Sequence, residues 1–382
     1  MRTAITPRIR RGATIATEPA AAAAELYEAI HQPDTSVAVF FCSPDYDLDQ
    51  LGPELAQRFE GINLIGCTTA GEITPEGYLS GAITGASLVS PDFKAVTRRL
   101  DNVSDFRLRD GETMTCDLLA EMTDRGIEPS SKDTFAFLLV DGLCCQEESI
   151  VSSLYRGLPN LPLFGGSAGD ATNFQSTFVY HDGRFHQDAA VFTVVQTSFP
   201  FTVFKTQHFV SSDTKMVITG ADPGRRIVSE INGVPAGREY ARLVGLDIDK
   251  LTPMIFASHP VVVKIGGLQY VRSIQKVNPD ESLTFFCAID EGLVLTVARG
   301  VDFVDTLKAR FASIREEIGE PEFVLGCDCI LRNLELDERG IREEVGRILA
   351  ENNVIGFGTY GEQYNAVHVN QTLTGVAIGA RQ

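Results

Sequence analysis

A glycine-rich bend occurs twice in this chain of 382 residues, and its repetition constrains the fold more than any other feature. The second copy runs from Val354 to Glu362. A shift of 290 positions superposes identical residues: Ile65, Gly66, Thr69, Gly71, Glu72, Thr84 and Gly85 fall on Ile355, Gly356, Thr359, Gly361, Glu362, Thr374 and Gly375. A looser third copy, from Pro162 to Asp170, is one residue shorter. The chain therefore uses one local architecture more than once.

In each copy an apolar run leads into closely spaced glycines and ends in a carboxylate. Glycine permits positive φ and close approach of the backbone, and α/β proteins place ligands where buried strands end. The bends predict a binding site that includes Gly66, Thr69, Glu72, Gly356, Thr359 and Glu362. The alternative is a tight turn in which Thr and Glu side chains bind nearby backbone amides.

The bends follow a recurring order of strand, helix, strand and bend. Residues 36–42 form an uninterrupted apolar run, which is typical of a strand buried on both faces, and residues 48–59 have apolar positions at helical spacing. The same order recurs from residue 134 to the third bend, and a hairpin of residues 177–180 with 189–196 is predicted after it. The first half therefore contains an internal duplication of about 100 residues.

These patterns predict a mixed α/β fold: two packed α/β domains with internally repeated strand-helix-strand-bend units and mixed sheets. We expect residues 1–34 to form an N-terminal arm and helix, residues 35–231 an N-terminal domain, and residues 232–382 a C-terminal domain.

Composition restricts the partners. The net charge of −18 argues against nucleic acid and anionic membranes, since both attract clustered Lys and Arg. No run reaches the 18 apolar residues of a membrane span, and the N-terminus lacks the apolar core of a signal peptide. The eight cysteines are typical of reduced thiols in a reducing compartment. We therefore expect a cytoplasmic protein.

Longer motifs resemble one known family. The segments Ile65-Gly-Cys-Thr-Thr-Ala-Gly-Glu72 and Phe164-Gly-Gly-Ser-Ala-Gly-Asp170 resemble the N-terminal half of the FIST sensory domain, and Gly356 to Glu362 resembles its C-terminal half. The resemblance covers residues 35–379. Four further segments are most similar to the FIST subgroup known as NosP: Gly326 to Arg332, Thr206 to Phe209, Tyr360 to Tyr364, and Val367 to Thr372.

The resemblance implies a ligand-sensing module of bacterial signal transduction. NosP proteins are described as binding haem and reporting nitric oxide to a partner histidine kinase or cyclic-di-GMP synthase or phosphodiesterase. By this resemblance the cofactor would be haem b, and a homodimer is an allowed assembly. The alternative is a FIST domain that binds a small metabolite such as an amino acid, without haem.

A haem site needs an axial ligand, an apolar slot and cations for the propionates. Among the histidines, His368 follows the second bend, His208 lies between Phe204 and Phe209, and His259 precedes an apolar strand. We rank His368 and His208 equally as the iron ligand, with His259 third. The alternative for each is a histidine satisfied by local hydrogen bonds.

Arginines supply the cations. Arg272, Arg332 and the pair Arg225-Arg226 lie in segments that resemble the family, and a guanidinium group binds a carboxylate in two-point contact. Such a contact would hold a haem propionate or an amino-acid carboxylate equally well.

An enzyme is the other class of function to consider. The carboxylates of Glu72, Asp170 and Glu362 could act as acid and base if they met. No nucleophile elbow, Walker loop or His/Cys metal spacing accompanies them in the sequence. We therefore predict that the protein is not an enzyme.

Overall fold

The first repeat builds a mixed sheet in this computed structural model, which describes residues 8–265 and 268–381. The strand order is β1-β6-β2-β3, in which β2 and β3 are parallel and the other pairs antiparallel. These elements are β1 (Ile9–Thr14), α1 (Pro19–Ile30), β2 (Thr35–Cys42), α2 (Leu48–Arg58), β3 (Leu64–Thr68) and β6 (Ile83–Val89). The helices pack their apolar residues on the outer face of the sheet.

Two further sheets have the same construction. The second repeat has the order β7-β12-β8-β9, with β7 (Phe93–Asp101), α3 (Leu108–Asp124), β8 (Thr134–Val140), α4 (Glu147–Gly157), β9 (Leu163–Ser167) and β12 (Ala189–Thr197). The third repeat has the order β13-β26-β22-β23, with β13 (Phe201–Thr206), α7 (Phe303–Ile318), β22 (Pro321–Cys329), α8 (Ile330–Arg339), α9 (Arg342–Glu351), β23 (Val354–Thr359) and β26 (Leu373–Gly379). Each sheet has one parallel pair: β2 with β3, β8 with β9, and β22 with β23.

Each glycine-rich bend leads into a short hairpin that completes the sheet of another repeat. The three hairpins are β4 (Glu72–Thr74) with β5 (Gly77–Leu79), β10 (Val179–His181) with β11 (Arg184–His186), and β24 (Glu362–Tyr364) with β25 (Val367–Val369). The first pairs with β23, the second with β3 and the third with β9. The three repeats are thus joined in a closed ring of exchanged hairpins.

The inner faces of the three sheets share one hydrophobic core. Phe41 of the first repeat stacks on Phe357 of the third with ring centroids 4.3 Å apart, and Phe137 stacks on Phe164 within the second at 4.8 Å. Burying one such aromatic side chain contributes about 1.5–3 kcal/mol to folding. The core explains why the central strands are apolar on both faces, since helices cover their outer sides.

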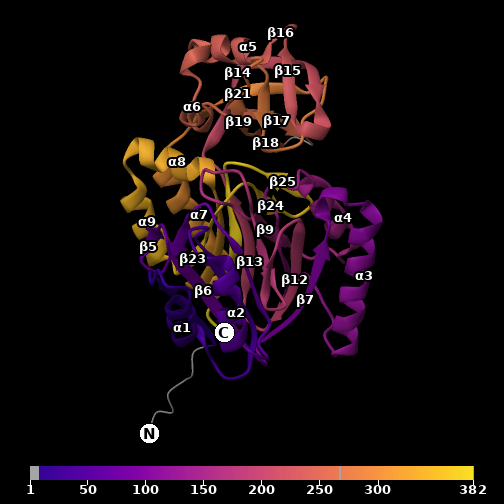
Figure 1. The fold of residues 1–382 in the computed structure, drawn as a ribbon, viewed down its shortest axis with the longest axis vertical. Helices are drawn as coiled ribbons and strands as arrows, with labels where there is room; N and C mark the ends of the chain where they lie inside the picture. The colour runs from indigo at the N-terminus through magenta and orange to yellow at the C-terminus, as the bar shows by residue number, and fades with distance from the viewer. Residues whose placement is uncertain (1–7, 266–267, 382) are drawn as a thin grey trace.

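A fourth unit is inserted into the third repeat between β13 and α7, and it forms the upper part of Figure 1. We call residues 209–300 the inserted unit and the three repeats the core. The inserted unit has its own hydrophobic cluster. Its elements are β14 (Phe209–Asp222), β15 (Ile227–Ile231), β16 (Val234–Pro235), α5 (Ala236–Val244), α6 (Pro253–Ser258), β17 (Val261–Ile265), β18 (Leu268–Arg272), β19 (Ile274–Val277), β20 (Leu283–Phe285) and β21 (Val294–Gly300). Three short 3-10 helices, at Val103–Asp105, Pro223–Arg225 and Ile248–Lys250, complete the described structure.

The mixed α/β fold class and its mixed sheets of repeated units are confirmed. The prediction of a hairpin between residues 177–180 and 189–196 is wrong. β10 pairs with β11, and β12 lies between β7 and β8. The boundary expected between residues 231 and 232 falls within the β15–β16 hairpin. This boundary and the three domain ranges stay predictions. Residues 1–7 of the N-terminal arm lie outside the described residues.

Candidate functional site

The carboxylates of the first two bends fix the local backbone. Glu72 accepts hydrogen bonds from the hydroxyl of Thr69 and from the backbone N–H of Ala82 at 3.1 Å. Glu362 does the same: it accepts from the hydroxyl of Thr359 at 2.5 Å and from the N–H and hydroxyl of Thr372 at 3.1 and 2.7 Å. Each carboxylate joins the start of a hairpin to the residue ten positions further along. The alternative interpretation of the bends, a tight turn in which Thr and Glu side chains hold the backbone, predicted contacts of this kind.

Burial alters the acidity of both groups. It raises the pKa of Glu72 to about 7 and that of Glu362 to about 8, although the hydrogen bonds from the threonines oppose the change. Asp170 of the third bend instead accepts three backbone N–H groups and the hydroxyl of Tyr360. The three carboxylates are therefore occupied in holding loops.

Two of the predicted site glycines are required by strand packing. A Cβ on Gly66 would lie 2.5 Å from the carbonyl oxygen of Phe40, and one on Gly356 would lie 1.8 Å from that of Gly326. Both glycines face the neighbouring parallel strand, so a side chain would collide with its backbone. Their role in the structure is close packing of β3 on β2 and of β23 on β22.

His368 lies on β25, where the core meets the inserted unit, and only 1% of it is exposed. The side-chain amide of Gln363 lies 3.3 Å from its Nδ1, and the same amide nitrogen lies 3.5 Å from the carbonyl oxygen of Gly361. Because a carbonyl oxygen only accepts, this nitrogen is the NH₂ donor and Nδ1 is the acceptor. Burial lowers the pKa of His368, so the ring is neutral. Because Nδ1 accepts, the single proton of the neutral ring lies on Nε2.

The inserted unit adds polar groups to the same place. Arg272 at the end of β18 points one guanidinium nitrogen at the carbonyl oxygen of His368, 3.5 Å away. The backbone N–H of Ser273 lies 3.5 Å from the side-chain oxygen of Asn370. These contacts are long for hydrogen bonds, so they show proximity between the two units with little bonding.

Five buried side chains at this point each keep a polar atom without a hydrogen-bond partner among the described residues. We call them the junction cluster: Arg272 (Nε), Ser273 (Oγ), Gln363 (Oε1), His368 (Nε2) and Asn370 (Nδ2). Buried polar groups are nearly always hydrogen-bonded, and an unpaired one calls for an explanation, of which an ordered water or a ligand is one. Three of these groups donate, one accepts, and the serine hydroxyl does either. The arrangement suits a small molecule that has both a carboxylate and a donor group.

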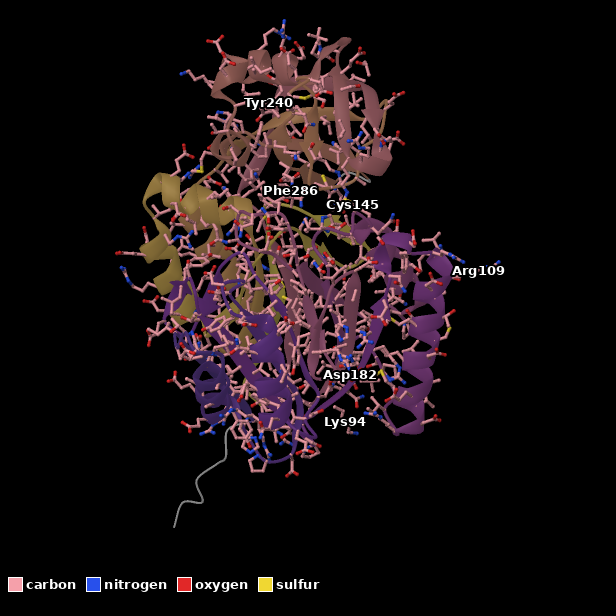
Figure 2. The ribbon with its side chains drawn as sticks, in the orientation of Figure 1. Lys94, Arg109, Cys145, Asp182, Tyr240 and Phe286 are labelled. Carbon is pink, nitrogen blue, oxygen red and sulfur yellow. The ribbon has the colours of Figure 1, made fainter. Side chains whose placement is uncertain are left out.

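A charged clamp lies beside the junction cluster. The Arg226 guanidinium of the inserted unit is 2.6 Å from the carboxylates of both Glu147 and Glu148 at the start of α4, and it donates to the carbonyl oxygen of Phe286 at 2.5 Å. Burial would favour neutral arginine, but the two carboxylates outweigh it and raise the pKa of Arg226. Figure 2 shows Phe286 and Cys145 where the two units meet.

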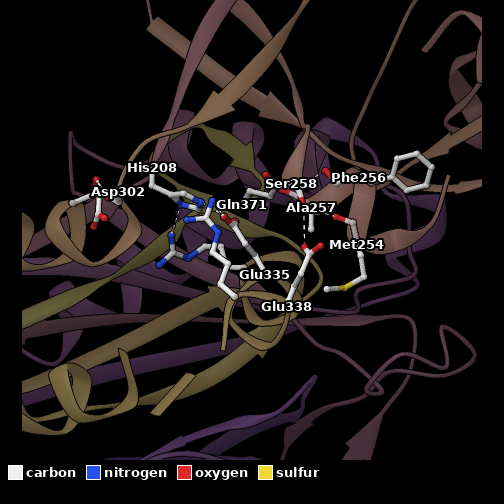
Figure 3. Close-up of polar contacts among 12 residues, drawn as sticks. His208, Met254, Phe256, Ala257, Ser258, Asp302, Glu335, Glu338 and Gln371 are labelled. Carbon is white, nitrogen blue, oxygen red and sulfur yellow. Dashed lines mark hydrogen bonds and ion pairs between the residues drawn. The ribbon is translucent and has the colours of Figure 1, made fainter. Parts of the chain in front are cut away.

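His208 belongs to a different buried network (Figure 3). Arg332 lies 3.1 Å from Nδ1, and the carboxylate of Glu335 lies 2.8 Å from Nε2. Since arginine only donates, Nδ1 accepts and Nε2–H donates to Glu335. Arg332 is also bound to Asp328 at 2.6 Å. Neither ring nitrogen of His208 is left for iron, and Arg332 is not available to a propionate.

The remaining predicted ligand, His259, caps α6 within the inserted unit and is half-buried. The structure therefore brings together His368 and Arg272, and it places His208, His259 and Arg332 elsewhere. Among the described residues no group of three or more His, Cys, Asp and Glu side chains could hold a metal ion. The neighbours of His368 are polar, whereas haem needs an apolar slot, so these residues fit a small polar ligand better than haem.

Sequence reasoning missed Gln363, Asn370 and Ser273. Asn370 follows β25 directly, two positions after His368, and the alternation of a strand puts such residues on one face. Asn370 could therefore have been found. The pairing of Gln363 with His368 across the β24–β25 turn was a second available signal. No sequence signal indicated Ser273, because this residue belongs to the inserted unit and not to the core.

Two family models match this chain. The FIST N domain matches residues 36–234 and the FIST C domain residues 236–365. An uncharacterised protein of Methanocaldococcus jannaschii is 23% identical over 376 residues, which covers 86% of this chain and 72% of that protein. A solved cyanuric acid hydrolase aligns over 97% of this chain and 99% of its own, with a TM-score of 0.38 and 8% identity.

Along the described residues no helix has both the length and the apolar character needed to cross a membrane. The two matched models together extend over most of the chain and meet near residue 235. The chain belongs to the FIST family, whose domains have a sensory role in signal transduction.

Proposed function

We propose that this protein senses a small polar metabolite carrying a carboxylate, such as an amino acid, bound at the junction cluster. The observation that carries the proposal is a set of five buried polar atoms, from both the core and the inserted unit, that have no hydrogen-bond partner in the described part of the chain. A ligand there would satisfy groups that otherwise cost about 1–3 kcal/mol each.

The donors and acceptors divide as an amino acid requires. Arg272 Nε–H, His368 Nε2–H and the Asn370 amide would donate to the carboxylate. Gln363 Oε1 and the hydroxyl of Ser273 would accept from the ammonium group. In this role His368 works as a neutral hydrogen-bond donor, consistent with its lowered pKa.

Signalling follows from the position of the site between two units. A ligand that bridges them stabilises one relative placement of the inserted unit over others. To change a partner's state appreciably, this preference must amount to a few kcal/mol. The partner would be a histidine kinase or a cyclic-di-GMP synthase or phosphodiesterase, and the protein itself would not be a catalyst.

The test is isothermal titration calorimetry of the protein against the free amino acids. We expect one or a few to bind, and we expect Arg272→Gln and His368→Ala each to weaken binding about 10- to 100-fold, because each removes a hydrogen bond to a charged group. The matched controls are Arg299→Gln and His259→Ala in the inserted unit. If the control variants weaken binding as much, or if no amino acid binds, the proposal is refuted.

A second candidate is a haem-dependent nitric oxide sensor. It is favoured by one observation: Nε2 of His368 is buried near Arg272 and has no hydrogen-bond partner within residues 8–265 and 268–381. To ligate iron, the ring would have to move its proton to Nδ1, and the Gln363 amide would have to rotate to accept it. Bound haem would supply the iron that nitric oxide recognises.

Absorption spectra after mixing with haem b, with and without nitric oxide, test this second candidate. We expect His368→Ala to remove the haem band if iron is bound here, whereas His208→Ala should leave it unchanged because His208 has both nitrogens engaged. A band that survives His368→Ala would rule out haem at the junction cluster.

A further inference from the structure

A separate cleft of about 420 Å³ opens between the core and the inserted unit. The core contributes Cys145, Asn173 and Phe174, and the inserted unit contributes Arg226, Lys276 and Phe286 among others. This volume lies within the range of small-molecule sites, and interfaces between units are common places for them.

The charged side chains that line the cleft are all cationic among the described residues. Arg225, Arg226 and Lys276 line it, and its lining includes no Asp or Glu among the residues that the structure describes. Arg226 faces the two carboxylates of the clamp on α4, and Asp280 interacts electrostatically with Arg225. No ion pair within the described chain engages the exposed side chains of Arg225 and Lys276. In a chain of net charge −18, such a cationic concavity attracts small anions.

The cleft also has an aromatic wall. The ring of Phe174 lies 5.6 Å from that of Phe286 and 4.7 Å from that of Tyr360, all centroid to centroid. Phe174 is only half-buried, so part of its surface faces the cleft. A flat apolar group could lie against it.

Backbone strain is concentrated at the same place. Cys145, Phe174 and Arg226 all line the cleft, and all have positive φ, at 57°, 54° and 54°. This conformation costs a non-glycine residue about 1–3 kcal/mol and persists only where the surroundings enforce it, commonly at ligand sites. For Phe174 the enforcing contact is its backbone N–H, which donates to the carboxylate of Asp170 at 2.8 Å.

We propose that this cleft binds a small aromatic anion, with its ring against Phe174 and its negative group between Arg225 and Lys276. The site is distinct from the junction cluster. The two places adjoin, because the backbone N–H of Phe286 donates to the carbonyl oxygen of Ser273 at 2.9 Å, but no residue of the junction cluster lines the cleft. The inference therefore does not depend on the proposed metabolite site.

Cysteine labelling gives a local readout. Cys145 lines the cleft, Cys116 is exposed on α3, and the other cysteines are buried. We expect naphthalene-2-carboxylate at millimolar concentration to slow the reaction of Cys145 with N-ethylmaleimide, measured by peptide mass spectrometry, and to leave the rate at Cys116 unchanged. The neutral 2-naphthamide should protect about tenfold more weakly, because it lacks the charge that the cations recognise.

Matched variants complete the test. The pair Arg225→Gln and Lys276→Gln should abolish the preference for the carboxylate over the amide. The control pair Lys94→Gln and Lys132→Gln, in another surface cavity, should retain it, and so should His368→Ala. The proposal is overturned if Cys145 is not protected, if Cys116 is protected equally, if the amide protects as well as the carboxylate, or if the control pair abolishes the preference.

Discussion

Among single residues, Glu362 shows how burial changes chemistry. A glutamate in the unfolded chain has a pKa near 4.5, whereas the folded protein raises that of Glu362 to about 8. Between these values the folded protein keeps a proton that the unfolded chain has released, so the folded state binds more protons. The contribution of Glu362 to the free energy of unfolding is therefore fully present below pH 4.5, decreases as the pH rises, and is lost once the pH has passed 8.

Replacing Glu362 with glutamine should remove this pH dependence, because glutamine resembles the protonated acid and keeps an oxygen for the N–H of Thr372. We expect the wild type to lose about 2–4 kcal/mol more than Glu362→Gln between pH 5 and pH 8.5, at about 1.4 kcal/mol per pKa unit. Urea unfolding at both pH values measures the difference. Glu343→Gln, on the exposed start of α9, is the control, and a parallel pH profile for wild type and Glu362→Gln would contradict the prediction.

At the scale of elements, the sequence predicted well those strands whose signal is local. Residues 36–42 and 134–140 are uninterrupted apolar runs, and both are buried central strands. β1 was missed because Ile9-Arg-Arg-Gly-Ala-Thr14 reads as polar. The exchange of hairpins was also missed, since a short strand pairs with a partner far along the chain and no local pattern records which one.

The candidate site was predicted in part, for a related reason. His208 and His368 are alike in sequence, since each follows or precedes apolar residues. What separates them is whether a partner reaches each ring nitrogen, and those partners come from distant elements. The bends were located correctly, but their glycines pack strands and their carboxylates hold hairpins, which a repeat of sequence does not distinguish from ligand binding.

For the whole molecule, the Arg226 clamp links the inserted unit to α4 of the core. We expect Arg226→Met to destabilise the protein by about 3–5 kcal/mol, because it leaves the buried carboxylate of Glu147 and the half-buried carboxylate of Glu148 without their paired cation. Amide hydrogen exchange should rise in α4 and around Phe286. The exposed neighbour Arg225→Met should cost under about 0.5 kcal/mol.

Restoring charge balance provides the complementary measurement. Adding Glu147→Gln and Glu148→Gln to Arg226→Met should recover most of the lost stability, since no unpaired charge then remains. An Arg226→Met protein as stable as Arg225→Met would show that the clamp does not hold the two units together.

The ring of exchanged hairpins has a consequence for synthesis on the ribosome. The sheet of the first repeat can be completed once β11 has emerged, but β4 and β5 must wait for β23, about 280 residues later. The second sheet waits about 195 residues, from the end of β9 at Ser167 to the start of β24 at Glu362. Two of three unpaired edges are therefore exposed on the nascent chain until translation is almost finished, which is when aggregation or capture by a chaperone competes with folding.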